Sequence, residues 1–312
     1  MQTDTAGPAI NFAVVDPTPA PAVSASAPLY LTEPKPDLAA WLRFFTQVDL
    51  PVLTATARAI EDLRAIEDDV DAGMLSRVID TDPLMTLKLL IDVSQRRRDE
   101  DRTETETVTS SLVMYGVAPF FRRFGPQPTL EDQLRDQPDA LQGALALLDR
   151  SRRAAHYALA FAVHRGDTDA AVIQEAAFLH DFVDLLMWCY APTLQLDLRA
   201  KQKADASLRS APLQRFVYHV DFNDLRQALM KLWHLPSLLV RISDGKHADH
   251  PAVRNVVLAV RLARHSQYGW DNAAIPDDIN DIALLLNAAP RVTQSYLRKL
   301  DPNLQTTPPS ST

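Results

Sequence analysis

The chain has 312 residues, a formal net charge of −8 and a single cysteine. An acidic chain lacks the basic face that nucleic-acid binding requires, so no nucleic-acid partner is expected. No apolar run approaches the roughly 20 residues of a membrane helix, so no membrane insertion is expected. Glycine-rich nucleotide-binding motifs are also absent, so a glycine-rich nucleotide site is not supported. Cys189 sits in an apolar run, which predicts a buried free thiol and a reduced, cytoplasmic compartment.

The two ends of the chain differ in composition from the middle. Residues 1–36 are rich in Pro, Ala, Ser and Thr and show no apolar periodicity, which predicts a disordered leader. Residues 301–312 are expected to be a frayed tail. The sequence therefore predicts one folded region, residues 37–300, with an N-terminal part of about 37–125 and a second part of about 126–300.

The N-terminal part has the spacing of amphipathic helices. Asp71 is an expected N-cap, and Asp82-Pro83 reads as an N-cap followed by proline in the first turn. Residues 96–106 are nearly all charged and are predicted to form a solvated loop. Residues 108–124 are apolar again, are interrupted by Gly116 and Pro119, and predict two short helices.

The second part continues the helical pattern, and strict alternation of apolar and polar residues never persists. The fold class is therefore predicted to be all-α, a multi-helix domain. Residues 130–149 predict one helix with a break near Pro138, and residues 151–164 predict the next. The remaining predicted helices are 176–188, 193–206, 210–219, 221–233, 236–244, 251–268, 277–288 and 290–300.

The predicted helix 176–188 is apolar on nearly every side but contains His180, Asp181 and Asp184. Burying an unpartnered polar group costs roughly 2–7 kcal/mol, and a charge costs more. A metal ion, a hydrogen-bond network or a neutral protonation state must therefore accompany these residues.

Several segments, in order, resemble the HDOD domains, the HD-related output domains of bacterial signalling proteins. The family's opening Leu-Pro-x-Leu-Pro motif is similar to residues 49–53, its Asp-Pro helix to residues 79–90, and its Ser-Ile-x-x-Ala-Ile-x-x-Leu-Gly segment to residues 109–117. Ala177-Phe178-Leu179-His180-Asp181 resembles the family's Gly-Leu-Leu-His-Asp, and Trp233-His234-Leu235-Pro236 resembles its Trp-x-Leu-Pro. The resemblance covers roughly residues 40–265.

Resemblance to the catalytic HD phosphohydrolases implies an early His ligand, the His-Asp pair and further histidines. Here Arg150 stands near the early His position, and Lys246-His247 stands where a His-His pair is expected. Near Phe222 and Arg226, where relatives show a His and a Gly, neither residue type occurs. Cationic side chains repel a metal ion and cannot ligate it as imidazole does.

Two hypotheses follow for the site. In one, His180 and Asp181 bind a divalent metal such as Fe or Mn with help from His156, His247 or His250, as a phosphohydrolase would require. In the other, His180 and Asp181 form hydrogen bonds to each other, to the backbone or to Arg150, which could pair with Asp181. The site is then vestigial, with no catalytic, cofactor-binding or metal-binding residue. The vestigial-site candidates are Arg150, His180, Asp181, Asp184, Lys246, His247 and His250.

The second hypothesis is the favoured prediction. The resemblance implies a non-catalytic signal-transduction module of a bacterial cytoplasm that binds an unknown signalling protein or a small-molecule or nucleotide ligand. The alternative is a metal-dependent phosphohydrolase that acts on a nucleotide or cyclic dinucleotide.

Overall fold

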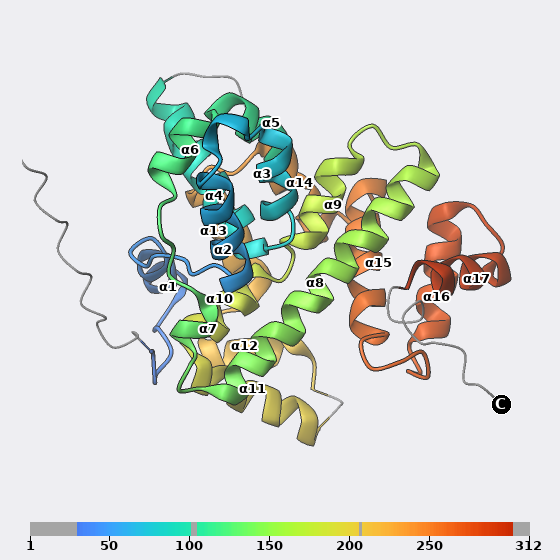
Figure 1. Cartoon of the computed structure of the whole chain (residues 1–312). Helices are drawn as coiled ribbons and strands as arrows, with labels where there is room; N and C mark the ends of the chain where they lie inside the picture. The colour runs from blue at the N-terminus through green and yellow to red at the C-terminus, as the bar shows by residue number, and fades with distance from the viewer. Residues whose placement is uncertain (1–29, 101–104, 206–207, 302–312) are drawn as a thin grey trace, which may run out of the picture.

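A computed structural model describes residues 30–100, 105–205 and 208–301 (Figure 1). Over these residues the chain forms helices, and the nearest approach to a sheet is one isolated parallel bridge between Val52 and Thr129, so the predicted all-α class is confirmed. None of the helices described is both long and apolar enough to span a membrane. Residues 1–29 of the predicted leader and residues 302–312 of the predicted tail lie outside the described residues.

The helices follow one another with short connections. In chain order they are α1 (Leu38–Phe45), α2 (Thr54–Arg64), η1 (Glu67–Asp69), α3 (Ala72–Ile79), α4 (Pro83–Glu100), α5 (Val108–Tyr115), α6 (Val117–Arg123), α7 (Leu130–Gln133), α8 (Pro138–Arg165), α9 (Ala170–Phe178), α10 (Phe182–Tyr190), α11 (Pro192–Ala204), α12 (Ser210–Tyr218), α13 (Phe222–Leu232), α14 (Ser237–Ile242), η2 (Gly245–His247), α15 (Pro251–His265), α16 (Ile275–Leu286) and α17 (Pro290–Leu300).

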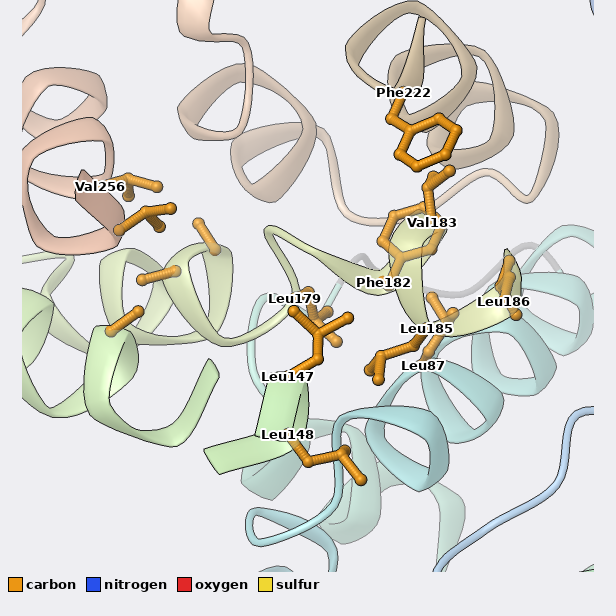
Figure 2. Packing of buried hydrophobic residues seen from close by; sticks show 14 of the residues in the cluster. Leu87, Leu147, Leu148, Leu179, Phe182, Val183, Leu185, Leu186, Phe222 and Val256 are labelled. Atoms are coloured by element: carbon orange, nitrogen blue, oxygen red, sulfur yellow. The ribbon is translucent and has the colours of Figure 1, made fainter. Parts of the chain in front are cut away.

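Buried apolar side chains form two clusters. The smaller joins α2 to α6 and contains Phe120, Phe121 and Phe124, while the larger joins α1 to the helices from α8 onwards. Helix α4 contributes to both, because Leu87 packs into the larger cluster and Leu89 into the smaller. Figure 2 shows Leu87 beside α10 and α8 residues of the larger cluster.

Helix α8 is the long central helix of the domain (Figure 1). Pro138 lies at its start, which confirms the predicted break there, but the predicted separation near residue 150 is wrong, since the helix runs uninterrupted to Arg165. Two charged residues near this point are buried with partners, because Arg150 pairs with Asp181 and Arg153 with Asp301.

Helix α4 continues further than predicted. Asp82 caps it as expected, accepting hydrogen bonds from the backbone amides of Leu84 and Met85. Residues 96–100, predicted to begin a loop, still belong to the helix. Arg96 is held there by an ion pair to Asp92 one turn earlier (3.4 Å) and by its position over the Tyr115 ring.

Ordered contacts reach beyond the predicted boundaries of the folded region. The amide of Leu31 donates to the carbonyl of Tyr190 (2.7 Å), and Lys35 lies over the Phe44 ring, so the residues before 37 already contact the domain. At the other end Asp301 is 1% exposed and accepts from Arg153 and from the indole of Trp270. Leu31, Lys35 and Asp301 therefore pack against the helical region directly.

Candidate functional site: the buried histidine–aspartate turn

The His180–Asp181 pair lies in a turn between α9 and α10, not within a continuous helix as the sequence predicted. The amide of His180 donates to Ala177 and that of Phe182 to Leu179, both three residues back, so the helix is interrupted there. The interruption frees the carbonyl of His180, which accepts from Arg226 Nη1 at 2.9 Å. A tertiary partner thus compensates for the lost helical hydrogen bond.

Asp181 is paired through both carboxylate oxygens. Arg150 donates to Oδ2 from Nε (3.1 Å) and Nη2 (2.7 Å), and Oδ1 lies 2.8 Å from Nδ1 of His180. The side chains of Arg150 and Asp181 are only 7% and 8% exposed. Burial alone would raise the pKa of the Asp181 carboxyl, but the Arg150 charge and the His180 hydrogen bond hold this pKa well below its usual range. The ion pair expected between Arg150 and Asp181 is therefore present.

His180 is neutral near pH 7. Burial, together with the Arg226 charge, lowers the pKa of His180 to about 4, although its bond to Asp181 acts in the opposite direction. Since Asp181 is ionised, Nδ1 of the neutral ring must carry the proton and donate it. The ring is thereby oriented by Asp181, and Nε2 is left as an acceptor.

Asp184 belongs to a different network. Its Oδ1 accepts from Nε2 of Gln195 (2.9 Å), whose Oε1 accepts in turn from the hydroxyl of Tyr218 (2.6 Å). Burial and the Asp181 charge raise the pKa of Asp184. This carboxyl joins α10 to α11 and α12 instead of completing a ligand set with His180.

Lys246, His247 and His250 interact with residues outside the turn. Lys246 is exposed and pairs with Asp224 (2.9 Å), while Nδ1 of His250 accepts the Ala252 amide at the start of α15. His247 and His250 line a separate cavity of ≈ 620 Å³ whose lining includes neither His180 nor Asp181. His156 lines another cavity, on the side of α8 facing α5. Of the predicted vestigial candidates, Arg150 and His180 both contact Asp181, and the others do not join them.

Arg226 is the site residue that the sequence did not assign. It lies on α13 and, besides His180, it donates to Asn223 Oδ1 (2.7 Å) and to the carbonyl of Ser243 (3.0 Å). The sequence offered one indication of its importance, because Arg226 stands near a position where the resembling family shows a different residue type. The chemical role of Arg226 depends on α13 packing against α10, which the sequence does not reveal.

This donor set does not fit a divalent metal ion. Both oxygens of Asp181 are already occupied, and two guanidinium groups, Arg150 and Arg226, would oppose a further positive charge. Across residues 30–100, 105–205 and 208–301, no three His, Cys, Asp or Glu side chains are grouped so that they could hold a metal ion. The site is a histidine–aspartate turn in which Arg150 pairs with the carboxylate of Asp181.

A helical domain with a His-Asp turn of this kind defines the HD-related class of proteins. The HDOD-domain model matches residues 50–248, well over half of the chain, and the chain therefore belongs to the HDOD family. No curated protein matches the sequence.

Solved structures show the same fold. A response regulator, MmoQ, from Methylococcus capsulatus strain Bath is 22% identical with a TM-score of 0.58, covering 76% of this chain and 98% of its own. A virulence factor from Campylobacter jejuni is 16% identical with a TM-score of 0.59, covering 88% of this chain and 99% of its own. At these identities the likeness concerns the fold.

Proposed function

We propose that this chain is a non-catalytic HDOD module of bacterial signal transduction, acting in the cytoplasm by binding a protein or a small ligand. The observation that carries the proposal is the double hydrogen bond from Arg150 to Asp181. In an HD hydrolase this carboxylate would be needed for a metal, whereas here a fixed cation saturates it. The structurally similar MmoQ is a response regulator, which is consistent with a signalling role.

A binding module that signals through a conformational change needs two helix arrangements that a partner can distinguish. The turn supplies a suitable element, because α9 and α10 are joined there by side chains from α8 and α13, not by continuous helix. A partner that binds one arrangement of these helices more tightly than another would shift the equilibrium of the turn towards that arrangement. The leader is a further candidate handle, with only its last residues inside the described part of the chain.

Metal content and phosphodiesterase activity test the proposal directly. The purified full chain is incubated with Mn²⁺ or Fe²⁺, desalted, analysed for metal and assayed with bis(p-nitrophenyl) phosphate and a cyclic dinucleotide. We expect no stoichiometric metal and no turnover above the buffer rate.

The alternative, a metal-dependent phosphohydrolase, predicts the opposite result. One or two metal ions per chain, with turnover that His180→Ala abolishes, would establish that alternative. His219→Ala, at an exposed position, is the matched control, since a change at this histidine should leave any such activity intact.

A further inference from the structure

A polar cavity of ≈ 420 Å³ lies between the N-terminal helices and the central pair α8 and α9. Asp80, at the end of α3, and Thr109, on α5, line one side. Arg152 of α8 and Glu175 of α9 line the other, while Phe178 supplies apolar surface. The cavity thus lies where residues of the smaller cluster's helices meet those of the larger.

Glu175 is buried in this cavity without a full set of partners. Glu175 is only 7% exposed. Its carboxyl group accepts a hydrogen bond from the backbone amide of Val108, the first residue of α5. The second oxygen, Oε1, has no hydrogen-bond partner among the described residues. An unsatisfied buried acceptor is costly, so a ligand that donates to Oε1 would recover part of that cost.

The ionisable groups around the cavity favour a cation once Glu175 has released its proton. Asp80 lies close enough for its charge to act on Glu175, and it accepts from Ser76 Oγ at 2.7 Å. Arg152 is exposed and donates to the carbonyl of Thr81 (2.9 Å), with no ion pair to Glu175. Two carboxyl groups therefore face one guanidinium group that is already engaged elsewhere.

We infer that this cavity binds a small molecule through an ammonium or guanidinium group seated between Glu175 and Asp80. Such a group provides several N–H donors and a positive charge, which Oε1 and the two carboxyls require. The inference rests on the proposed function, for which it supplies the small-ligand site. A ligand here would hold α5 and α3 against α9, the helix that ends directly before the His180 turn.

Binding should release a proton. Burial, together with the Asp80 charge, raises the pKa of Glu175 to about 8, and burial also raises the pKa of Asp80. The other ionisable groups facing the cavity are Arg152 and His156 of α8, while α5 contributes only hydroxyls. Near pH 7 most Glu175 carboxyls are protonated, so an incoming cation displaces that proton into the buffer.

Calorimetry on the full chain tests the inference with n-butylguanidine as the probe and n-butylurea as its neutral isostere. We expect n-butylguanidine to bind about tenfold or more tightly than n-butylurea. Its heat at pH 7 should differ between phosphate and Tris buffers by an amount that reports proton release. N-acetylarginine amide carries the same guanidinium group on a peptide backbone. If it binds more tightly than n-butylguanidine, the natural ligand is an arginine side chain of a protein.

Glu175→Gln removes the charge while keeping the shape, and it should lower n-butylguanidine affinity by about tenfold or more. It should also abolish the buffer dependence. Glu61→Gln, on the exposed side of α2, is the matched control and should bind like the wild type. Thermal melts establish that both variants are folded.

Three outcomes would overturn the inference: equal binding of the urea and the guanidine, no binding at millimolar probe, or unchanged binding by folded Glu175→Gln. Each leaves the proposed function standing, because a non-catalytic module can bind its ligand elsewhere. Metal-dependent turnover would instead refute the proposed function and leave the cation site unaffected.

Discussion

Arg150 decides how the buried Asp181 is tolerated. A carboxylate in this position would be strongly unfavourable alone, and the guanidinium supplies both a compensating charge and two hydrogen bonds. The intact ion pair need not add net stability to the fold, because apolar residues of similar volume could replace both side chains at little cost.

Arg150→Ala should therefore destabilise the protein by about 3–5 kcal/mol, since it leaves the Asp181 charge buried without its partner. Urea denaturation at pH 7 measures the free energy of unfolding. Arg58→Ala, at an exposed position, is the control and should change stability by less than about 0.5 kcal/mol. A loss below about 1 kcal/mol for Arg150→Ala would contradict this role of the ion pair.

His180 makes stability depend on pH in a defined direction. Its pKa falls from the usual 6.5 to about 4 in the folded state, so the unfolded state binds more protons between these values. Stability contributed by the neutral ring is present above pH 6.5 and is lost as the pH falls towards 4. Glu175, whose pKa is raised to about 8, contributes the opposite slope between pH 4.5 and 8, so the test must compare variants.

His180→Asn keeps an amide donor for Asp181 and does not titrate. Between pH 7 and pH 4, the variant should gain up to about 3 kcal/mol of unfolding free energy relative to the wild type. Urea melts at several pH values give the difference, and His219→Asn provides the baseline at an exposed site. Parallel stability curves for wild type and His180→Asn would show that the ring is not protected from protonation.

At the scale of elements, a glycine sets the approach of α8 to α10. A Cβ atom at Gly143 would overlap the six-membered ring of Trp188, which is 2% exposed and belongs to α10. Glycine is normally unfavourable within a helix by about 1 kcal/mol, so its presence here reflects packing. The position of α10, and with it the His180 turn, depends on this close contact.

Gly143→Ala should therefore destabilise the protein by about 1–3 kcal/mol despite the better helix propensity of alanine. Denaturant melts measure the change. Combining it with Trp188→Leu, which removes the obstructing ring, should reduce the additional cost of the alanine. If Gly143→Ala is neutral or stabilising on its own, the contact does not constrain α8.

The interruption between α9 and α10 is the element-scale feature that sequence periodicity misread. Residues 176–188 have the apolar composition of one buried helix. In the structure the freed carbonyl of His180 is instead satisfied by Arg226, while Arg150 pairs with the Asp181 side chain. The helix ends marked by capping residues were predicted more accurately. Asp71 and Asp82 accept the expected amide hydrogen bonds, and Gly116, at φ 83°, separates α5 from α6.

For the whole molecule, α4 links the two apolar clusters. Leu84, Leu87 and Leu90 pack into the larger, while Met85 and Leu89 pack into the smaller. A helix cannot unfold one face alone, so the clusters should lose structure together. All four tryptophans, Trp41, Trp188, Trp233 and Trp270, belong to or pack against the larger cluster, which gives a probe for that cluster.

Tryptophan fluorescence and far-ultraviolet circular dichroism should accordingly give coincident urea transitions. Leu89→Ala, which changes only the smaller cluster, should shift both probes together and cost about 2–5 kcal/mol. A Leu89→Ala transition seen by circular dichroism alone, with the fluorescence midpoint unchanged, would show that the smaller cluster unfolds independently.

The sequence by itself determined the helical class and most helix boundaries, because apolar periodicity and capping residues act locally. The family was indicated separately, by the order of several short motifs that resemble those of HDOD domains. Comparison with the resembling family also raised Arg150 as one possible partner of Asp181, and the structure shows that pairing. Only the tertiary structure decided that α8 is continuous, that the His-Asp pair lies in a turn, and that Arg226 and Glu175 are placed as they are. Those features depend on charges far apart in the sequence compensating one another in a low-dielectric interior, which a local pattern does not encode.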